Sequence, residues 1–98
     1  MMTTLALRLR ATEIVPGERL PDDWCVVLEG RAIGRIMRVQ RAGAEWAWFW
    51  TLMLFPSSTA DRGDAPTFEE AKAAFRRRAE AVWPFDLGRL THLPRENS

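Results

Sequence analysis

The sequence predicts an α+β domain in which a three- to four-stranded antiparallel β-meander packs on one C-terminal α-helix. Three observations favour this fold class. Apolar and polar residues alternate through segments of the first half of the chain, as they do in half-buried strands. Short turn-forming stretches separate these segments, which is typical of consecutive antiparallel strands. Apolar residues then recur at intervals of three and four in a later segment, as on one face of a helix.

The first strand is expected over residues 5–15, where leucines and arginines alternate. The leucines are Leu5, Leu7 and Leu9, and the arginines between and after them are Arg8 and Arg10. This period of two places the leucines on one side and the arginines on the other. The stretch "PGERLPDD", residues 16–23, is expected to be a loop, because it contains two prolines and a glycine.

A hairpin is expected next, with strands over residues 24–29 and 32–39. The two β-prone runs, "WCVVLE" and "AIGRIMRV", are joined by Gly30-Arg31, and glycine suits the positive φ of a two-residue turn. This register places Leu28 opposite Ile33, and it places Gly34 opposite Val27, where a glycine would mark a close approach or a bulge.

The fourth strand is expected over residues 45–54, which include the tryptophan-rich stretch "EWAWFWTLML". We expect a four-residue loop, Arg41 to Ala44, because this length pairs Met37 with Trp48 and Val39 with Trp46. A loop one residue longer or shorter would turn the tryptophans away from these partners. The same register puts Arg35 on the tryptophan face, at the sheet edge or across an indole ring.

The stretch "FPSSTADRGDAP", residues 55–66, has the composition of a loop, and a helix is expected over residues 68–83. Thr67 and Glu70 have the spacing of a capping box, and Pro84 ends the helix. One domain, residues 1–94, should contain all these elements, with a frayed tail over 95–98. The expected core combines the sheet's tryptophans with the helix's apolar stripe: Trp24, Trp46, Trp48, Trp50, Phe68, Phe75 and Val82.

Composition excludes several classes of protein. The 98 residues fit one domain, and 14 basic against 13 acidic residues leave a net charge of +1, too small for long-range attraction to a polyanion. The single cysteine, Cys25, can form neither an internal disulfide nor a zinc site, so we expect a cytoplasmic protein. The apolar run from Trp46 to Phe55 is about half the length that a membrane-spanning helix needs, and no membrane association is expected.

The sequence shows no catalytic constellation. The only histidine, His92, lies near the C-terminal end, and the apolar neighbours of Cys25 favour a buried structural thiol. Asp61 and Asp64 flank a glycine, as turn-forming aspartates do, and no third ligand is spaced to complete a cation site. We therefore expect no enzymatic activity, no cofactor and no metal ion.

Three pieces of the sequence together resemble a group of short uncharacterised bacterial proteins. The pieces are "IGRIMR", "WAWFW" and "GDAPTFEEAKAAFRRRAEAVW", within residues 24–83. They correspond to a Gly-Arg-Ile hairpin, a Trp-x-Trp strand and a Glu-Ala-Lys-Ala-Ala-Phe helix. This sequence departs from the group at Met37, where an aromatic residue is usual, and at Trp83, which lies about a turn beyond the usual position. The resemblance implies a compact strand–hairpin–helix domain and implies no activity.

Two functions remain open at this level. The first is a small non-enzymatic interaction module that binds a protein partner or forms a homo-oligomer, since the face carrying Ile36, Phe49 and Met53 would suit a second layer or a homodimer. The second is a nucleic-acid-binding protein that uses an arginine surface. Its candidate residues are Arg35, Arg38, Arg76 and Arg77. The tryptophan-rich stretch likewise has three interpretations: a strand of the core, a platform on which bases stack, or a surface for a protein partner.

Overall fold

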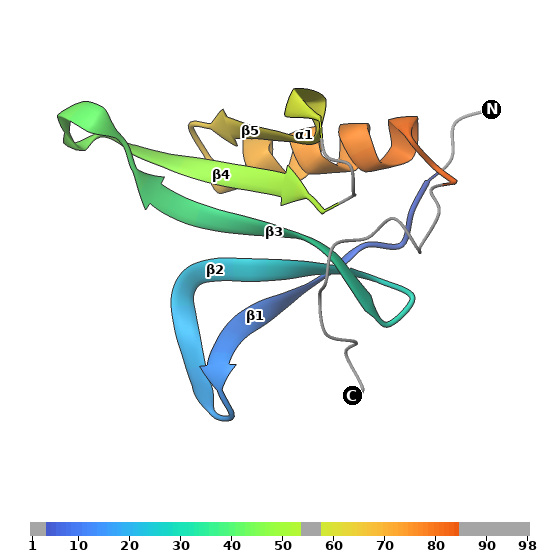
Figure 1. The fold of residues 1–98 in the computed structure, drawn as a ribbon, viewed down its shortest axis with the longest axis horizontal. Coiled ribbons are helices and arrows are strands. Elements are labelled where there is room, and N and C mark those ends of the chain that lie inside the picture. Colours follow the sequence, from blue (N-terminus) through green and yellow to red (C-terminus); the bar gives the residue numbers. More distant parts are fainter. Residues whose placement is uncertain (1–3, 54–57, 85–98) are drawn as a thin grey trace.

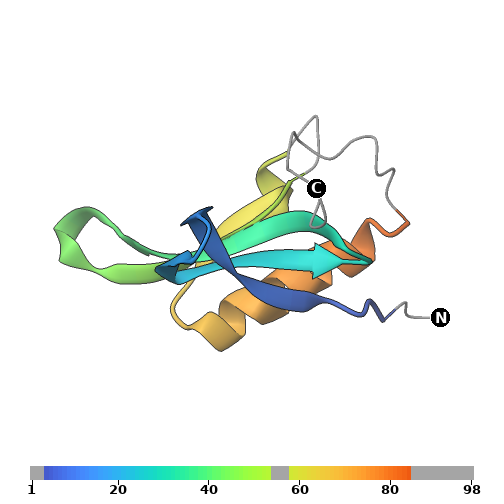
Figure 2. The same cartoon turned by 90° about the horizontal axis from the view of Figure 1, so that it is seen from below.

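The computed structural model describes residues 4–53 and 58–84, which form one antiparallel sheet and one helix (Figure 1). The strands are β1 (Arg8–Val15), β2 (Glu18–Leu28), β3 (Arg31–Gln40), β4 (Trp46–Leu52) and β5 (Arg62–Ala65). The helix is α1 (Phe68–Ala81), and the 3₁₀ turns η1 (Ala42–Ala44) and η2 (Thr59–Asp61) precede β4 and β5. The strands lie in the order β1-β2-β3-β4-β5, and α1 covers one face of the sheet (Figure 2). The α+β class is confirmed, with five strands described instead of three or four.

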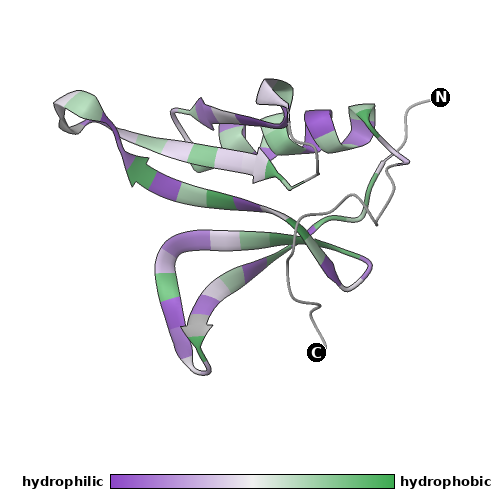
Figure 3. Cartoon of the chain, in the orientation of Figure 1, coloured by the Kyte–Doolittle hydropathy of each residue, from purple (hydrophilic) through white to green (hydrophobic). Residues whose placement is uncertain are grey.

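The β1–β2 hairpin is longer than the sequence predicts. The expected loop at residues 16–23 shrinks to a tight turn at Pro16-Gly17, with Gly17 at φ 87°, and β2 already begins at Glu18. Most residues from 18 to 22 are exposed, so their polar character reflects a solvated stretch of hairpin and not a break in the strand. In Figure 3 the far end of this hairpin is a mixture of hydrophilic and pale segments with single hydrophobic bands.

The turn between β2 and β3 lies one residue earlier than predicted. Glu29 and Gly30 have φ values of 52° and 78°, and positive φ at both central residues defines a type I′ turn. The register then shifts, because Val27 pairs with Ala32 while Val26 pairs with Gly34. Ile33 is thus the extra residue of a bulge, and both Ile33 and Gly34 lie against the core. The glycine in the sequence predicted such a bulge or close approach at this position.

The β3–β4 loop contains five residues, so the predicted four-residue loop is wrong. Gly43, at φ 83°, lets the chain turn through η1, and the Arg41 N–H donates to the Glu45 carbonyl at 2.7 Å. The longer loop pairs Ile36 with Trp50, Arg38 with Trp48 and Gln40 with Trp46. Met37 and Val39 therefore share the other face with Phe49 and Ala47.

The fifth strand lies inside the stretch that composition assigned to a loop. β5 has the sequence Arg-Gly-Asp-Ala, which contains no β-branched or aromatic residue. It pairs antiparallel with β4, and Gly63 lies opposite Trp50, where a side chain would press against the indole ring. Pairing with a long neighbouring strand and this close packing stabilise a segment of low intrinsic strand propensity.

The helix begins as predicted at Phe68 and ends at Ala81, two residues earlier than expected. The Thr67 hydroxyl accepts a hydrogen bond from the Glu70 N–H at 3.1 Å, as the capping spacing indicated. The Glu70 carboxylate accepts from the Thr67 hydroxyl instead of reaching back to a backbone amide. The fully buried stripe of the helix is Ala71, Phe75 and Ala79, and α1 packs mainly on β4 and β5.

The predicted core is mostly correct, with one error. Trp50 and Phe75 are buried, and Trp24, Trp48, Phe68 and Val82 are half-buried beside them. Trp46, however, is 54% exposed. It is the first residue of β4, at the end of a hairpin that extends past the start of α1 (Figure 1), so the helix does not reach far enough to cover it.

Candidate interaction surface

The exposed indole of Trp46 lies beside a guanidinium group. The Arg38 guanidinium carbon is 4.6 Å from the centre of the Trp46 ring, which is the geometry of a cation–π contact. Arg38 also lies 3.7 Å from a carboxylate oxygen of Asp22. Both side chains of this ion pair are substantially exposed, so water screens it and it contributes little to stability.

Further aromatic side chains adjoin Trp46 where α1 begins. The rings of Trp48 and Phe68 are 4.8 Å apart between centroids, and those of Trp24 and Phe68 are 6.2 Å apart. The Lys72 ammonium lies 4.7 Å from the centre of the Phe68 ring. We call Trp24, Trp46, Trp48 and Phe68 the aromatic end. It combines half-buried rings with one exposed indole and two cations.

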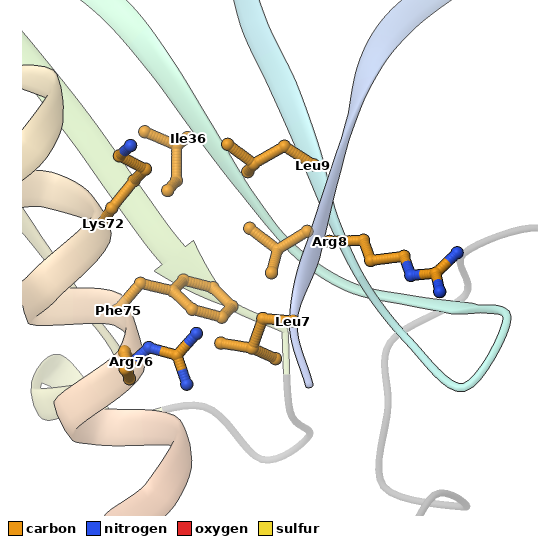
Figure 4. A pocket seen from close by; sticks show the side chains of 8 residues that line it. Leu7, Arg8, Leu9, Ile36, Lys72, Phe75 and Arg76 are labelled. Carbon is orange, nitrogen blue, oxygen red and sulfur yellow. The ribbon is translucent and has the colours of Figure 1, made fainter. Parts of the chain in front are cut away.

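A groove lies between β1 and α1 on the same side of the sheet (Figure 4). Its volume is about 310 Å³, at the lower end of the range for ligand-binding pockets. The lining residues are Leu7, Arg8, Leu9, Val26, Ile36, Lys72, Phe75 and Arg76. Figure 4 shows the Arg8 side chain extending away from α1, so the groove combines apolar side chains with two cations, Lys72 and Arg76, on its helix side.

Hydrogen bonds join the segment before β1 to α1 at one end of the groove. The Arg76 Nη1 donates to the Leu5 carbonyl at 2.7 Å and to the Glu80 carboxylate at 3.0 Å, and the Leu5 N–H donates to Glu80 at 3.0 Å. The backbone hydrogen bond from Leu5, with the neighbouring Arg76 charge, lowers the pKa of Glu80. This clamp joins the beginning of the described chain to the last turns of the helix.

The groove and the aromatic end form one continuous surface. Ile36, on the floor of the groove, is the cross-strand partner of Trp24. Lys72 lines the groove and also lies over Phe68. A bound segment could therefore contact both regions at once. We call the combination of groove and aromatic end the helix-side surface.

The structure does not bring the four predicted arginines together. Arg38 lies at the aromatic end, Arg76 at the groove, and Arg77 is exposed on the helix. The placement of Arg35 on the tryptophan face is wrong, since the longer β3–β4 loop pairs Arg35 with Thr51 on the opposite face. There, Arg35 Nε donates to the Asp23 carboxylate at 2.8 Å, and this bond raises the pKa of Arg35.

The potentially reactive residues are held in local polar contacts. Cys25 is a half-buried free thiol, and its Sγ lies 3.4 Å from the Thr12 hydroxyl. Asp61 accepts from Arg78 at 2.9 Å, and Asp64 accepts from Arg41 at 2.9 Å. Among residues 4–53 and 58–84, no three His, Cys, Asp or Glu side chains group to hold a metal ion. His92 lies outside the described residues.

Comparisons with known proteins do not assign the chain to a group. No family model, no curated protein and no solved structure matches it. Within the residues that the structure describes, α1 is too short and too polar to cross a bilayer, and no other helix there could do so.

Proposed function

We propose that this chain is a small non-enzymatic interaction module that binds a partner protein through its helix-side surface. The exposure of Trp46 carries the proposal. A tryptophan buries a large apolar area when it is covered, and tryptophan and arginine are enriched among the residues that dominate binding energy at protein interfaces. Trp46 and Arg38 present this pair at the surface, next to half-buried aromatic rings.

The chemistry of the surface indicates the kind of segment that it would bind. The groove offers an apolar floor of Val26, Ile36 and Phe75 to a hydrophobic side chain. Lys72 and Arg38 hold only exposed carboxylates, Glu69 and Asp22, which a carboxylate from the partner can replace. The expected partner segment therefore carries apolar side chains followed by acidic ones. A segment of a second copy of this chain is one such partner.

The arrangement of polar groups supports a binding role over a catalytic one. The buried carboxylates of Asp23 and Asp61 each accept hydrogen bonds from an arginine, Arg35 and Arg78 respectively. A carboxylate whose oxygens already accept hydrogen bonds from a guanidinium is poorly placed to take a proton from a substrate.

Peptide selection tests the proposal even though the partner is unidentified. A random displayed peptide library is selected on the wild-type protein, and the affinities of the enriched peptides are measured by fluorescence anisotropy. We expect apolar–acidic peptides whose affinity falls about ten-fold or more with Trp46→Ser or with Leu9→Lys, as for residues at the centre of an interface. Leu9 is a suitable site because it lines the groove and is 38% exposed.

Arg77→Ser serves as the matched control, because Arg77 is exposed on α1 outside the helix-side surface. It should leave peptide affinity unchanged. Selection that enriches no peptide, or peptides that bind equally to all four proteins, would refute the proposed function. Sedimentation equilibrium then identifies a self-associating form: if the partner is a second copy, the wild-type protein dimerises and Trp46→Ser is monomeric.

A further inference from the structure

The sheet face turned away from α1 carries a row of arginines that the sequence pattern alone does not group. Cross-strand partners lie on the same face of an antiparallel sheet. The registers connect five residues across all five strands in the order Arg10, Cys25, Arg35, Thr51 and Arg62. Adjacent rows contribute Arg8, Met37 and Phe49, and Arg41 lies over the Phe49 ring at 5.7 Å. We call these residues the outer face.

The charges of the outer face do not cancel. The carboxylates in these rows are Asp23, the cross-strand partner of Met37, and Asp64, the partner of Phe49. Each is bound by one arginine, Arg35 and Arg41 respectively. The other three arginines, Arg8, Arg10 and Arg62, are exposed and have no ion-pair partner among the described residues. Three positive charges in excess lie on one face of a chain whose net charge is +1.

The spacing of these cations suits an extended polyanion. Strands lie about 4.8 Å apart, so Arg10, Arg35 and Arg62 follow one another across the sheet at intervals of about 10 Å. Arg8 and Arg10 are two residues apart on β1, or about 7 Å. Guanidinium groups bind phosphate oxygens through paired hydrogen bonds, and the uncompensated arginines are free to do so.

We propose that the outer face binds single-stranded nucleic acid. The nucleic-acid strand runs across the sheet, with its phosphates bound by Arg8, Arg10 and Arg62 and its bases packed against the side chains of Met37 and Phe49. A duplex fits this face less well, because the major groove admits a helix or a two-stranded ribbon and is too narrow for the face of a five-stranded sheet. The site lies on the sheet face opposite the helix-side surface and adds a second binding activity to the proposed function. The two sites share Arg8, which lines the groove but extends its side chain away from α1 (Figure 4).

A fluorescein-labelled dT20 oligonucleotide is the probe, with binding measured by anisotropy at several salt concentrations. We expect affinity to fall as salt rises, and the double variant Arg10→Ser/Arg62→Ser to bind about ten-fold more weakly at low salt. The slope of log affinity against log salt should become shallower by about 0.7 for each arginine removed. The matched control Arg19→Ser/Arg77→Ser loses the same charge at exposed positions elsewhere and should bind as the wild type does.

Cys25 provides an independent readout of location. It is the only cysteine of the chain and lies between Arg10 and Arg35 in the row. Bound dT20 should slow its alkylation by iodoacetamide, while Trp46→Ser should leave dT20 binding unchanged. Equal losses in the two double variants, unprotected Cys25 with dT20 bound, or equal affinity for a matched duplex or for polyglutamate would each overturn the proposal. Failure of the peptide selection would leave these results unaffected.

Discussion

Gly34 illustrates how one residue governs the packing of the helix against the sheet. It lies beside the β3 bulge, at the point where the Phe75 ring meets β3. A methyl group at this position would overlap the ring and the carbonyl oxygen of Thr51. The side chain can move but the backbone oxygen belongs to a neighbouring strand, so only glycine fits without a shift of the sheet.

Gly34→Ala should lower the free energy of unfolding by at least about 2 kcal/mol, because it overpacks the core against backbone atoms. Urea denaturation measures the change. Gly43→Ala is the comparison, because the space around Gly43 is open. Its free energy of unfolding should fall by only about 1 kcal/mol, the cost of placing alanine in a left-handed backbone conformation. Equal losses for the two variants would show that Phe75 does not approach β3 this closely.

Glu80 gives the protein a stability that depends on pH. Its pKa in the folded state lies below the ordinary value, chiefly because the Leu5 N–H donates to the carboxylate and also because of Arg76. A lowered pKa adds stability above the carboxylate's ordinary pKa, and this stability disappears as pH falls through the folded-state value. Wild-type protein and Glu80→Gln should therefore differ in melting temperature at neutral pH and converge in acid.

The exposed turn variant Glu29→Gln controls for the loss of a carboxylate, and its melting curve should follow the wild type across the same pH series. A difference between Glu80→Gln and wild type that stays constant from neutral to acid pH would contradict the clamp between Leu5 and α1.

At the level of elements, local signals predict what depends on neighbouring residues and miss what depends on distant ones. The helix start at Phe68 and its Thr67 cap follow from adjacent residues, and the structure has both. The length of the β3–β4 loop does not follow from adjacent residues, because the left-handed conformation of Gly43 in η1 makes the loop one residue longer than predicted. β5 exists because it pairs with β4, and its own four residues carry no strand signal. The groove needs β1 beside α1, a contact between the two ends of the described chain.

The connection from β4 to α1 should depend on Asp61. Its buried carboxylate accepts from the Ser58 N–H at 3.0 Å and from Arg78 of the helix at 2.9 Å. Asp61→Ala removes both bonds and should cost about 1–3 kcal/mol of unfolding free energy. The matched Asp64→Ala breaks an exposed pair with Arg41 and should cost less than about 1 kcal/mol. Chemical denaturation compares them, and the reverse order would contradict the burial of Asp61.

At the level of the whole molecule, the five-stranded sheet separates two surfaces of different chemistry. The helix side contains the core and, beyond the cover of α1, the aromatic end and groove. The outer face contains the uncompensated arginines. The sequence predicted the sheet, the helix and most core residues, because burial patterns are local. The sequence could not assign the arginines to faces. An error of one residue in the length of the β3–β4 loop moves every side chain of β4 to the opposite face of the sheet relative to β3.

The central claim is that Trp46, at the end of β4 that α1 does not cover, lies in solvent, while Trp50 on the same face of β4 lies in the core. Acrylamide quenching of tryptophan fluorescence in the wild type and in Trp46→Phe tests it most directly. Trp46 is 54% exposed and Trp50 8%, so the readily quenched, red-shifted part of the native emission should be lost in Trp46→Phe. If Trp46→Phe leaves the quenching unchanged while Trp50→Phe abolishes the accessible part, the placement of α1 along β4 and the proposed interaction surface are both wrong.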